Sequence, residues 1–198
     1  MLNLLPCAAA GCPNHAVSFR DVCYSHIDDK EAYRRELFAY LEKEEKFIGL
    51  NLAYVPLEGL ELSGKVFMLV DFHGTQFRNI VMRNILLHIC FYDYALFEDC
   101  RIIQAKYTSC VFAGARLSGV LFEDSNMLQN NFNNSIMKNV TFKESDLYNT
   151  RFLAGDLENT HFNDCNLKNV DFRRTVRKNV TFKYSNYEDA IFDEKEKP

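Results

Sequence analysis

The stretch that decides the fold is residues 122–172, which read in groups of five as FEDSN MLQNN FNNSI MKNVT FKESD LYNTR FLAGD LENTH FNDCN LKNVD F. A large apolar residue opens each group, and this spacing continues in one unbroken phase from Leu52 to Phe192. Of these 29 positions, 28 are large and apolar, although only 47% of the chain is hydrophobic. A repeat this regular decides the fold before any local feature is considered.

A period of five belongs to neither regular element, because a helix repeats every 3.6 residues and a strand every two. The residue two places before each apolar centre is usually small, as at Ala115, Ser125 and Ser135. A chain that turns a corner every five residues can send one large and one small side chain inward on each side. Four sides close a square coil of twenty residues, and stacked coils pair at about 4.8 Å. Each coil lacks a core of its own, so stacking creates one continuous core.

The phase does not slip anywhere in the repeat, so no long loop is expected to project from it. Loops usually carry function on such scaffolds. The chain also contains no glycine-rich phosphate-binding loop. We therefore expect a protein without catalytic activity.

Several units read as a small residue, then Asp or Asn, then Leu or Phe, including residues 145–147, 165–167 and 170–172. This pattern resembles the pentapeptide-repeat family over about 145 of the 198 residues. The resemblance implies an all-β solenoid, a right-handed quadrilateral parallel β-helix of about seven coils. Lys65 departs from the pattern, since a small residue is expected there, so the first coil is expected to be distorted.

Composition and charge exclude several classes of protein. The formal net charge is −4 and no basic stripe stands out, so we expect no direct nucleic-acid binding. The apolar start of the chain lacks the positive residues and the long apolar core of a signal peptide. No run of about 18 apolar residues occurs, so no membrane span is expected. The expected compartment is the cytoplasm, where cysteines serve metal binding or packing rather than disulfides.

Four of the seven cysteines fall at the small interior position of the repeat: Cys90, Cys100, Cys110 and Cys165. We expect these thiols to be buried and inert. Cys90 and Cys110 stack one coil apart, and we expect them to remain reduced.

The other three cysteines and one histidine form the pattern C-x4-C-x10-C-x2-H: Cys7, Cys12, Cys23 and His26. Two ligand pairs joined by a short loop suit tetrahedral zinc, and thiolates and imidazole are fitting ligands. The segment resembles small treble-clef-like zinc knuckles. We predict a structural Zn²⁺ site, because four protein ligands leave no open position for catalysis; His15 is a rival ligand, and the alternative is three ordinary thiols.

The chain is expected to divide into four segments. Residues 1–28 form the zinc-knuckle-like segment, and residues 29–48 form an amphipathic helix with apolar residues from Tyr33 to Ile48 on one face. The β-helix occupies residues 49–194, and residues 195–198 form a polar tail. A solenoid exposes its core at its ends, so the helix is expected to cap the first coil, although partner binding is an alternative.

Two outward surfaces stand out as candidate interaction sites. Apolar residues occupy one side of the early coils: Val66, Leu69, Leu86 and Ile89. Either the N-terminal segment folds over them or a partner chain does. An acidic column follows later: Asp124, Glu144 and Asp164. It is a candidate site for a basic partner surface or a weak cation, or else a tolerated solvated face.

At the C-terminal end, Arg177 interrupts the apolar series, and its stem is expected to pack on Leu157 while its guanidinium leaves through the open end. No apolar segment follows Phe192, so the last coil is expected to be partly bare. We therefore expect an end-to-end homodimer through this coil.

The leading hypothesis for function is a non-catalytic scaffold that offers side-chain columns to an unidentified protein partner. The family resemblance implies an alternative, since some pentapeptide-repeat proteins imitate duplex DNA and bind DNA gyrase. The mild net charge of this chain weakens that alternative. A third hypothesis is a redox or metal sensor that works through the cysteines and histidine of the knuckle.

Overall fold

The computed structural model describes residues 4–194, and the expected polar tail at 195–198 lies outside them. From Tyr54 to Tyr184 the repeat turns a corner two places after each apolar centre, where the backbone has positive φ, as at Asn139, Asn159 and Asn179. Asn, Asp and Gly adopt this left-handed conformation more readily than other residues. Their frequency at these positions is therefore what allows a corner every five residues.

Three of the four sides of the coil are parallel sheets. The first sheet contains β1 (Lys46–Ile48), β3 (Val66–Met68), β6 (Leu86–His88), β9 (Lys106–Thr108) and β12 (Asn126–Leu128). The second contains β2 (Pro56–Glu58), β4 (Gln76–Arg78), β7 (Leu96–Glu98), β10 (Arg116–Ser118), β13 (Ile136–Lys138), β15 (Asp156–Glu158) and β17 (Val176–Lys178). The third contains β5 (Val81–Arg83), β8 (Arg101–Ile103), β11 (Leu121–Glu123), β14 (Thr141–Lys143) and β16 (His161–Asn163).

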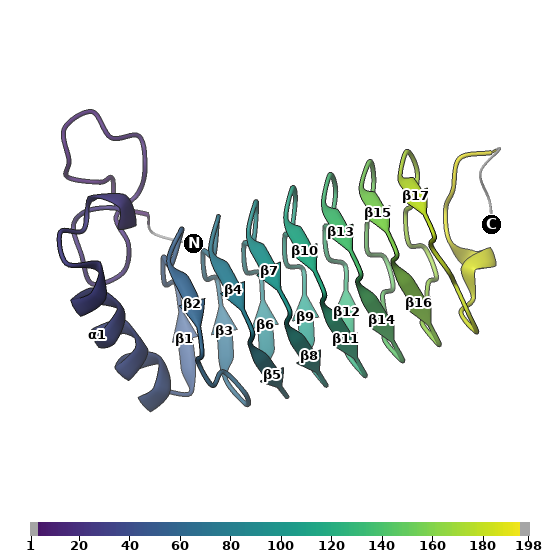
Figure 1. Ribbon diagram of the computed structural model, residues 1–198, viewed down its shortest axis with the longest axis horizontal. Coiled ribbons are helices and arrows are strands. Elements are labelled where there is room, and N and C mark those ends of the chain that lie inside the picture. The colour runs from purple at the N-terminus through teal and green to yellow at the C-terminus, as the bar shows by residue number, and fades with distance from the viewer. Residues whose placement is uncertain (1–3, 195–198) are drawn as a thin grey trace.

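The fourth side is held by single bridges between successive coils, in the column that starts at Asn51 and ends at Ile191. Figure 1 shows the coils stacked along one axis, with the helix at one end and the C-terminus at the other. Every pairing between coils joins residues twenty apart, as in Phe122 to Phe142 and Phe142 to Phe162. The expected parallel β-helix is therefore confirmed.

The interior consists of stacked side chains at this twenty-residue spacing. The rings of Phe132 and Phe152 are fully buried, with centroids 5.1 Å apart and planes 7° from parallel. Phe112 stacks on the other face of Phe132 at 4.4 Å. The four expected interior cysteines are buried and free. Within residues 4–194, no helix is long and apolar enough to cross a membrane.

The N-terminal helix is shorter than expected and begins and ends differently. Helix α1 spans Lys30–Lys43 rather than 29–48, with Asp29 accepting a hydrogen bond from the Ala32 amide at 2.8 Å. Residues 46–48 instead form strand β1, because Phe47 is in phase with the repeat and points into the core. Ile48, expected on the helical face, is 57% exposed on this strand. The solenoid therefore starts before residue 49.

Lys65 occupies a small interior position for a reason that the repeat pattern does not contain. Its ammonium donates to the carbonyl oxygens of Glu44 at 2.8 Å and Glu42 at 3.2 Å. These carbonyls belong to the C-terminal end of helix α1, where backbone acceptors lack partners and positive charge is favourable. Lys65 therefore ties the capping helix to the first coil.

At the other end, the core is less completely covered. Phe182, Tyr187 and Phe192 pack on the core but are only partly buried. Arg177 pairs in register with Leu157, and its guanidinium lies 4.9 Å from the centroid of the Phe192 ring. The short helical turn η2 (Tyr187–Asp189) follows β17 and lies at this end (Figure 1).

The substitution Phe132→Ala tests the ring stack. It removes a fully buried ring between two others, so the free energy of unfolding should fall by about 3–5 kcal/mol. The exposed Lys138→Ala, one coil side away, should change it by less than about 0.5 kcal/mol. Chemical denaturation followed by circular dichroism measures both, and equal small losses would contradict a buried stack.

Candidate metal centre

The first pair of candidate ligands is held by a hairpin in the N-terminal segment. The Cys7 amide donates to the Asn14 carbonyl at 2.9 Å, and the Ala16 amide donates to the Leu5 carbonyl at 2.8 Å. The Cys12 amide closes the turn onto the Ala9 carbonyl at 3.1 Å. Cys7 and Cys12 are thereby brought to one side of the hairpin.

The second pair is held by the helical turn η1 (Tyr24–His26). The His26 amide donates to the Cys23 carbonyl at 2.9 Å. Residues three apart lie on the same side of such a tight turn. Cys23 and His26 therefore point in the same direction, toward the hairpin.

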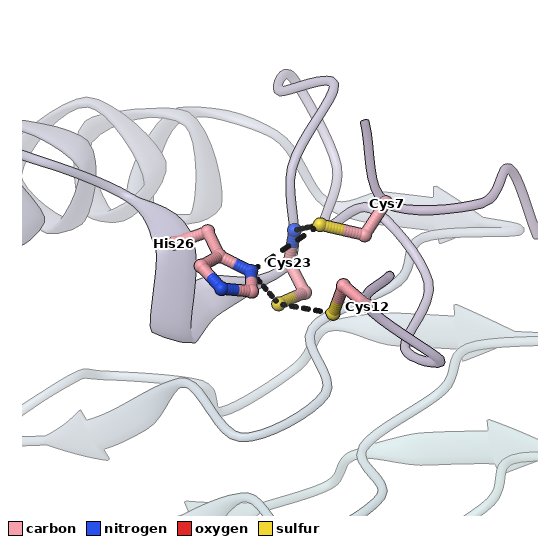
Figure 2. Close-up of side chains that lie close together, drawn as sticks. All are labelled: Cys7, Cys12, Cys23 and His26. Atoms are coloured by element: carbon pink, nitrogen blue, oxygen red, sulfur yellow. Dashed lines mark hydrogen bonds between the residues drawn. The ribbon is translucent and has the colours of Figure 1, made fainter. Parts of the chain in front are cut away.

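The four side chains converge on one point, as Figure 2 shows. Their donor atoms all lie within 4.8 Å of one another. Sγ of Cys12 is 3.8 Å from Sγ of Cys23, and Nδ1 of His26 is 3.3 Å from Sγ of Cys23. Sγ of Cys7 is 3.5 Å from Nδ1 of His26. A zinc ion with tetrahedral N and S ligands would separate these atoms by about 3.5–3.8 Å.

The surroundings favour the charged form of one thiol in particular. Burial alone would raise the pKa of Cys23, but hydrogen bonds from the Ser25 hydroxyl and the His26 amide lower it to about 6. A hydrogen bond to Cys7, and a second one to Cys23, raise the pKa of His26. The amide of Cys23 also donates to Sγ of Cys7 at 3.2 Å. This donor set can hold a metal cation, because a metal binds thiolates rather than thiols.

Asn51 joins this segment to the solenoid. Its side-chain amide, which is buried, donates to the Ala16 carbonyl at 2.7 Å. Its backbone carbonyl accepts from the Ser18 amide at 2.8 Å, and its own amide donates to the Ser18 hydroxyl at 2.9 Å. Residues 16–18 thus occupy the place of a preceding coil on the fourth side. Nothing in the repeat pattern distinguishes Asn51 from Asn131, which precedes an apolar centre in the same column, so sequence reasoning missed it.

The other candidate residues lie elsewhere. His15, the rival ligand, lies outside the four-residue cluster. The acidic column lies along a corner of the solenoid, at positive-φ positions: Asp124, Glu144 and Asp164. Val66 and Leu86 pair in register on the outer face of the first sheet, and Leu69 and Ile89 lie at the corner beside them. None of these residues is in the cluster.

Comparison with family models matches residues 115–192 to the family described as pentapeptide repeat region. Full-length QnrB1, a plasmid-mediated fluoroquinolone resistance protein, is 9% identical with a TM-score of 0.36, covering 75% of this chain and 92% of that one. HetL from the cyanobacterium Nostoc sp. strain PCC 7120, a pentapeptide repeat protein involved in heterocyst differentiation regulation, is 13% identical with a TM-score of 0.27, covering 87% and 100%. No match was found among curated proteins.

The substitution Asn51→Asp tests the joint between the knuckle and the solenoid. The aspartate keeps the acceptor oxygen but faces the Ala16 carbonyl with another oxygen, so stability should fall by about 1–3 kcal/mol. Hydrogen exchange at residues 5–18 should accelerate. Asn131→Asp, in the same column but away from the joint, should leave that segment unchanged; equal exchange in both variants would show that Asn51 does not hold it.

Proposed function

The chain contains a pentapeptide repeat region, and from that premise we propose that it is a non-catalytic scaffold for protein interaction, with a zinc ion holding its N-terminal end. One observation carries the scaffold role. From β1 to β17 each coil follows the last at a constant offset of twenty residues, so outward side chains form fixed columns. Rigid columns can present a pattern of side chains to a partner with little entropic cost on binding.

The proposed zinc site has a structural role in the N-terminal cap and no catalytic role. Cys7, Cys12, Cys23 and His26 would be the ligands, and their spacing and chemistry fit Zn²⁺. When bound, the metal would supply folding free energy to a segment too short to bury a core. The metal would then hold the hairpin and the η1 turn together. The hydrogen bonds of Asn51 would fix this segment against the first coil.

Zinc analysis tests this site. We expect about one zinc ion per chain, and Cys23→Ser should reduce it at least about tenfold. The buried Cys165→Ala, outside the cluster, should keep its zinc. Protons compete with the metal for thiolates, and the Cys23 thiolate persists down to about pH 6. Zinc release should therefore be steep below that pH; retention of full zinc by Cys23→Ser would contradict the ligand set.

The candidate partner surface is the apolar side of the early coils, which we call the apolar face: Val66, Leu69, Leu86 and Ile89. The N-terminal segment covers the end of the solenoid (Figure 1), and Leu86 remains 38% exposed. Lys46 and Lys106 lie in the same outward column as Val66 and Leu86, one coil before and one coil after them. A partner with apolar side chains flanked by carboxylates would complement this face.

Two residues of the apolar face have an unfavourable backbone conformation. Leu69 and Ile89 lie at corners with φ of 54° and 52°, where most other coils have Asn, Asp, Gly or Ser. This conformation costs a residue with a Cβ roughly 1–2 kcal/mol, and more when the side chain is β-branched. Strained residues that persist are concentrated at functional sites. An apolar contact with a partner is a role that would account for them.

Cross-linking and capture from cells that express the tagged chain tests the apolar face. Leu86→Lys should lower the yield of a specific partner at least about tenfold, because a charge would be buried in the contact. Val81→Lys is the matched control, since Val81 is also 38% exposed but lies on β5 of the third sheet. A partner retained equally by both variants would exclude this face.

The acidic column is the second candidate surface. Asp124 accepts a hydrogen bond from the side-chain amide of Gln104 at 3.0 Å. Glu144 lies 3.4 Å from the Lys143 ammonium, which offsets part of the charge of the column. The acidic column contains three carboxylates, and the DNA-mimic alternative requires this column to bind the partner in place of duplex DNA. A gyrase supercoiling assay with and without the purified chain distinguishes that alternative from the scaffold.

The sensor alternative rests on Cys23, whose pKa is lowered to about 6 and which therefore has thiolate character. It requires reversible zinc loss on oxidation, and it fits the cytoplasmic location that we propose.

We also propose the end-to-end homodimer, supported by partly buried Phe182 and Phe192 and by Val176, which is 65% exposed on the last strand. Light scattering over a concentration series measures this association.

A further inference from the structure

A cavity of about 190 Å³ lies where the knuckle meets the first two coils, on the fourth side of the solenoid. The proposed zinc ligand Cys23 also lines it, whereas no residue of the apolar face does. Its lining includes Asn14 and His15 from the knuckle, and Asn51, Tyr54, Asp71 and His73 from the coils. It therefore combines a carboxylate, two imidazoles, two amides and an aromatic ring.

The carboxylate of Asp71 has two imidazoles near it, those of His15 and His73, but no lysine or arginine partner in the described part of the chain. Its Oδ1 accepts a hydrogen bond from the His73 amide at 2.9 Å, and no Lys or Arg among residues 4–194 forms an ion pair with it. Burial raises the pKa of Asp71, and it also raises that of Asp93, one coil further on. Asp71 is therefore a partly buried carboxylate at the cavity wall that forms no ion pair with an arginine or lysine of residues 4–194.

The same column shows what such a carboxylate binds elsewhere in the chain. Asp171 occupies the position of Asp71 five coils later, and its Oδ1 accepts from the Arg173 amide at 3.0 Å, just as Asp71 accepts from His73. The guanidinium of Arg173 then contacts both oxygens of Asp171, at 3.0 and 2.7 Å. In the early coil the residue that would supply this guanidinium is His73, so the second oxygen of Asp71 has no such partner.

Aromatic rings form one wall of the cavity. The ring of Tyr54 lies over Gly74, where a Cβ atom would approach it to 2.5 Å, so glycine is required for the ring to lie there. His73 packs edge-to-face between Tyr54 and Tyr94, at 5.2 and 5.5 Å. Tyr54 is 45% exposed, so one part of its ring remains open to a ligand.

We propose that this cavity binds the guanidinium group of an arginine side chain presented by a protein partner. A guanidinium is planar and can donate two parallel hydrogen bonds to one carboxylate, whereas an ammonium is a point charge. It also packs favourably on the face of an aromatic ring, which Tyr54 supplies. The cavity is separate from the apolar face and from the acidic column, so the proposal can fail or succeed independently of both.

Titration of the zinc-loaded full chain with Nα-acetyl-arginine amide, followed by amide NMR shifts, tests the proposal. We expect saturable shifts at Tyr54, Asp71 and His73. Nα-acetyl-citrulline amide has the same shape without the charge, and it should bind at least tenfold more weakly. The lysine analogue should also bind more weakly than arginine, because it lacks the paired donors.

Asp71→Asn is the decisive variant, and it should weaken arginine binding at least tenfold. The variant should keep the hydrogen bond from the His73 amide to the side-chain oxygen of residue 71. Asn51 and Asn131 in the same column accept the equivalent hydrogen bond, at 3.0 and 2.9 Å. Asp146→Asn is the matched control: Asp146 accepts the same hydrogen bond from the Tyr148 amide at 3.0 Å, on another side of the solenoid. It removes the same charge far from the cavity and should bind arginine as the wild type does.

Tyr54→Ala provides a second variant that leaves the carboxylate in place, and it should weaken binding at least threefold. Thermal unfolding of all variants establishes that each is folded. The proposal is overturned if no saturable shift occurs at the cavity, if citrulline binds as well as arginine, or if Asp71→Asn binds no more weakly than Asp146→Asn.

Discussion

Every coil depends on its neighbours for its backbone hydrogen bonds. The corner amides show this plainly, since the amide of Asn139 donates to the Glu158 carbonyl and that of Asn159 to the Lys178 carbonyl. A stack of such coils satisfies its interior but leaves unpaired groups and bare core at both ends. Much of what is unusual in this chain lies at those ends, where the repeat cannot provide its own partners.

The N-terminal end is closed by three elements that act together. Helix α1 covers the core, Lys65 ties the end of that helix to the first coil, and residues 16–18 pair with Asn51 in the place of a missing coil. The proposed metal would hold the segment that supplies those residues. Among residues 4–194, the C-terminal end has only the η2 turn and Phe192 over its last rings, and this is the surface of the proposed homodimer.

The five-residue period was enough to predict the interior, because one large and one small residue per side leave few other arrangements. The spacing of Cys7, Cys12, Cys23 and His26 likewise predicted a cluster that the structure brings together. Features that depend on a contact between distant segments could not be predicted. Lys65 departs from the repeat pattern because it binds the end of helix α1, a segment distant in the sequence. The helix ends before Phe47 because Phe47 follows the phase of the solenoid.

The outward surface was less predictable, because the repeat constrains only what points inward. Leu69 and Ile89 could be recognised as apolar, but not as corner residues with positive φ. Asp71 and Asp171 occupy equivalent places, and only the structure shows that one carboxylate holds an arginine while the other faces a cavity. Similar repeat units can therefore serve different roles, depending on a residue two positions away.

The central claim is that residues twenty apart lie on top of one another along a single straight stack. Spin labels at Glu58 and Lys178, which begin and end one column of the second sheet, measure it by pulsed electron resonance. Six coil steps at the strand spacing predict a narrow distribution near about 29 Å between the labelled backbones. A broad distribution, or a mean beyond about 40 Å, would contradict the stacked coil and the surfaces inferred from it.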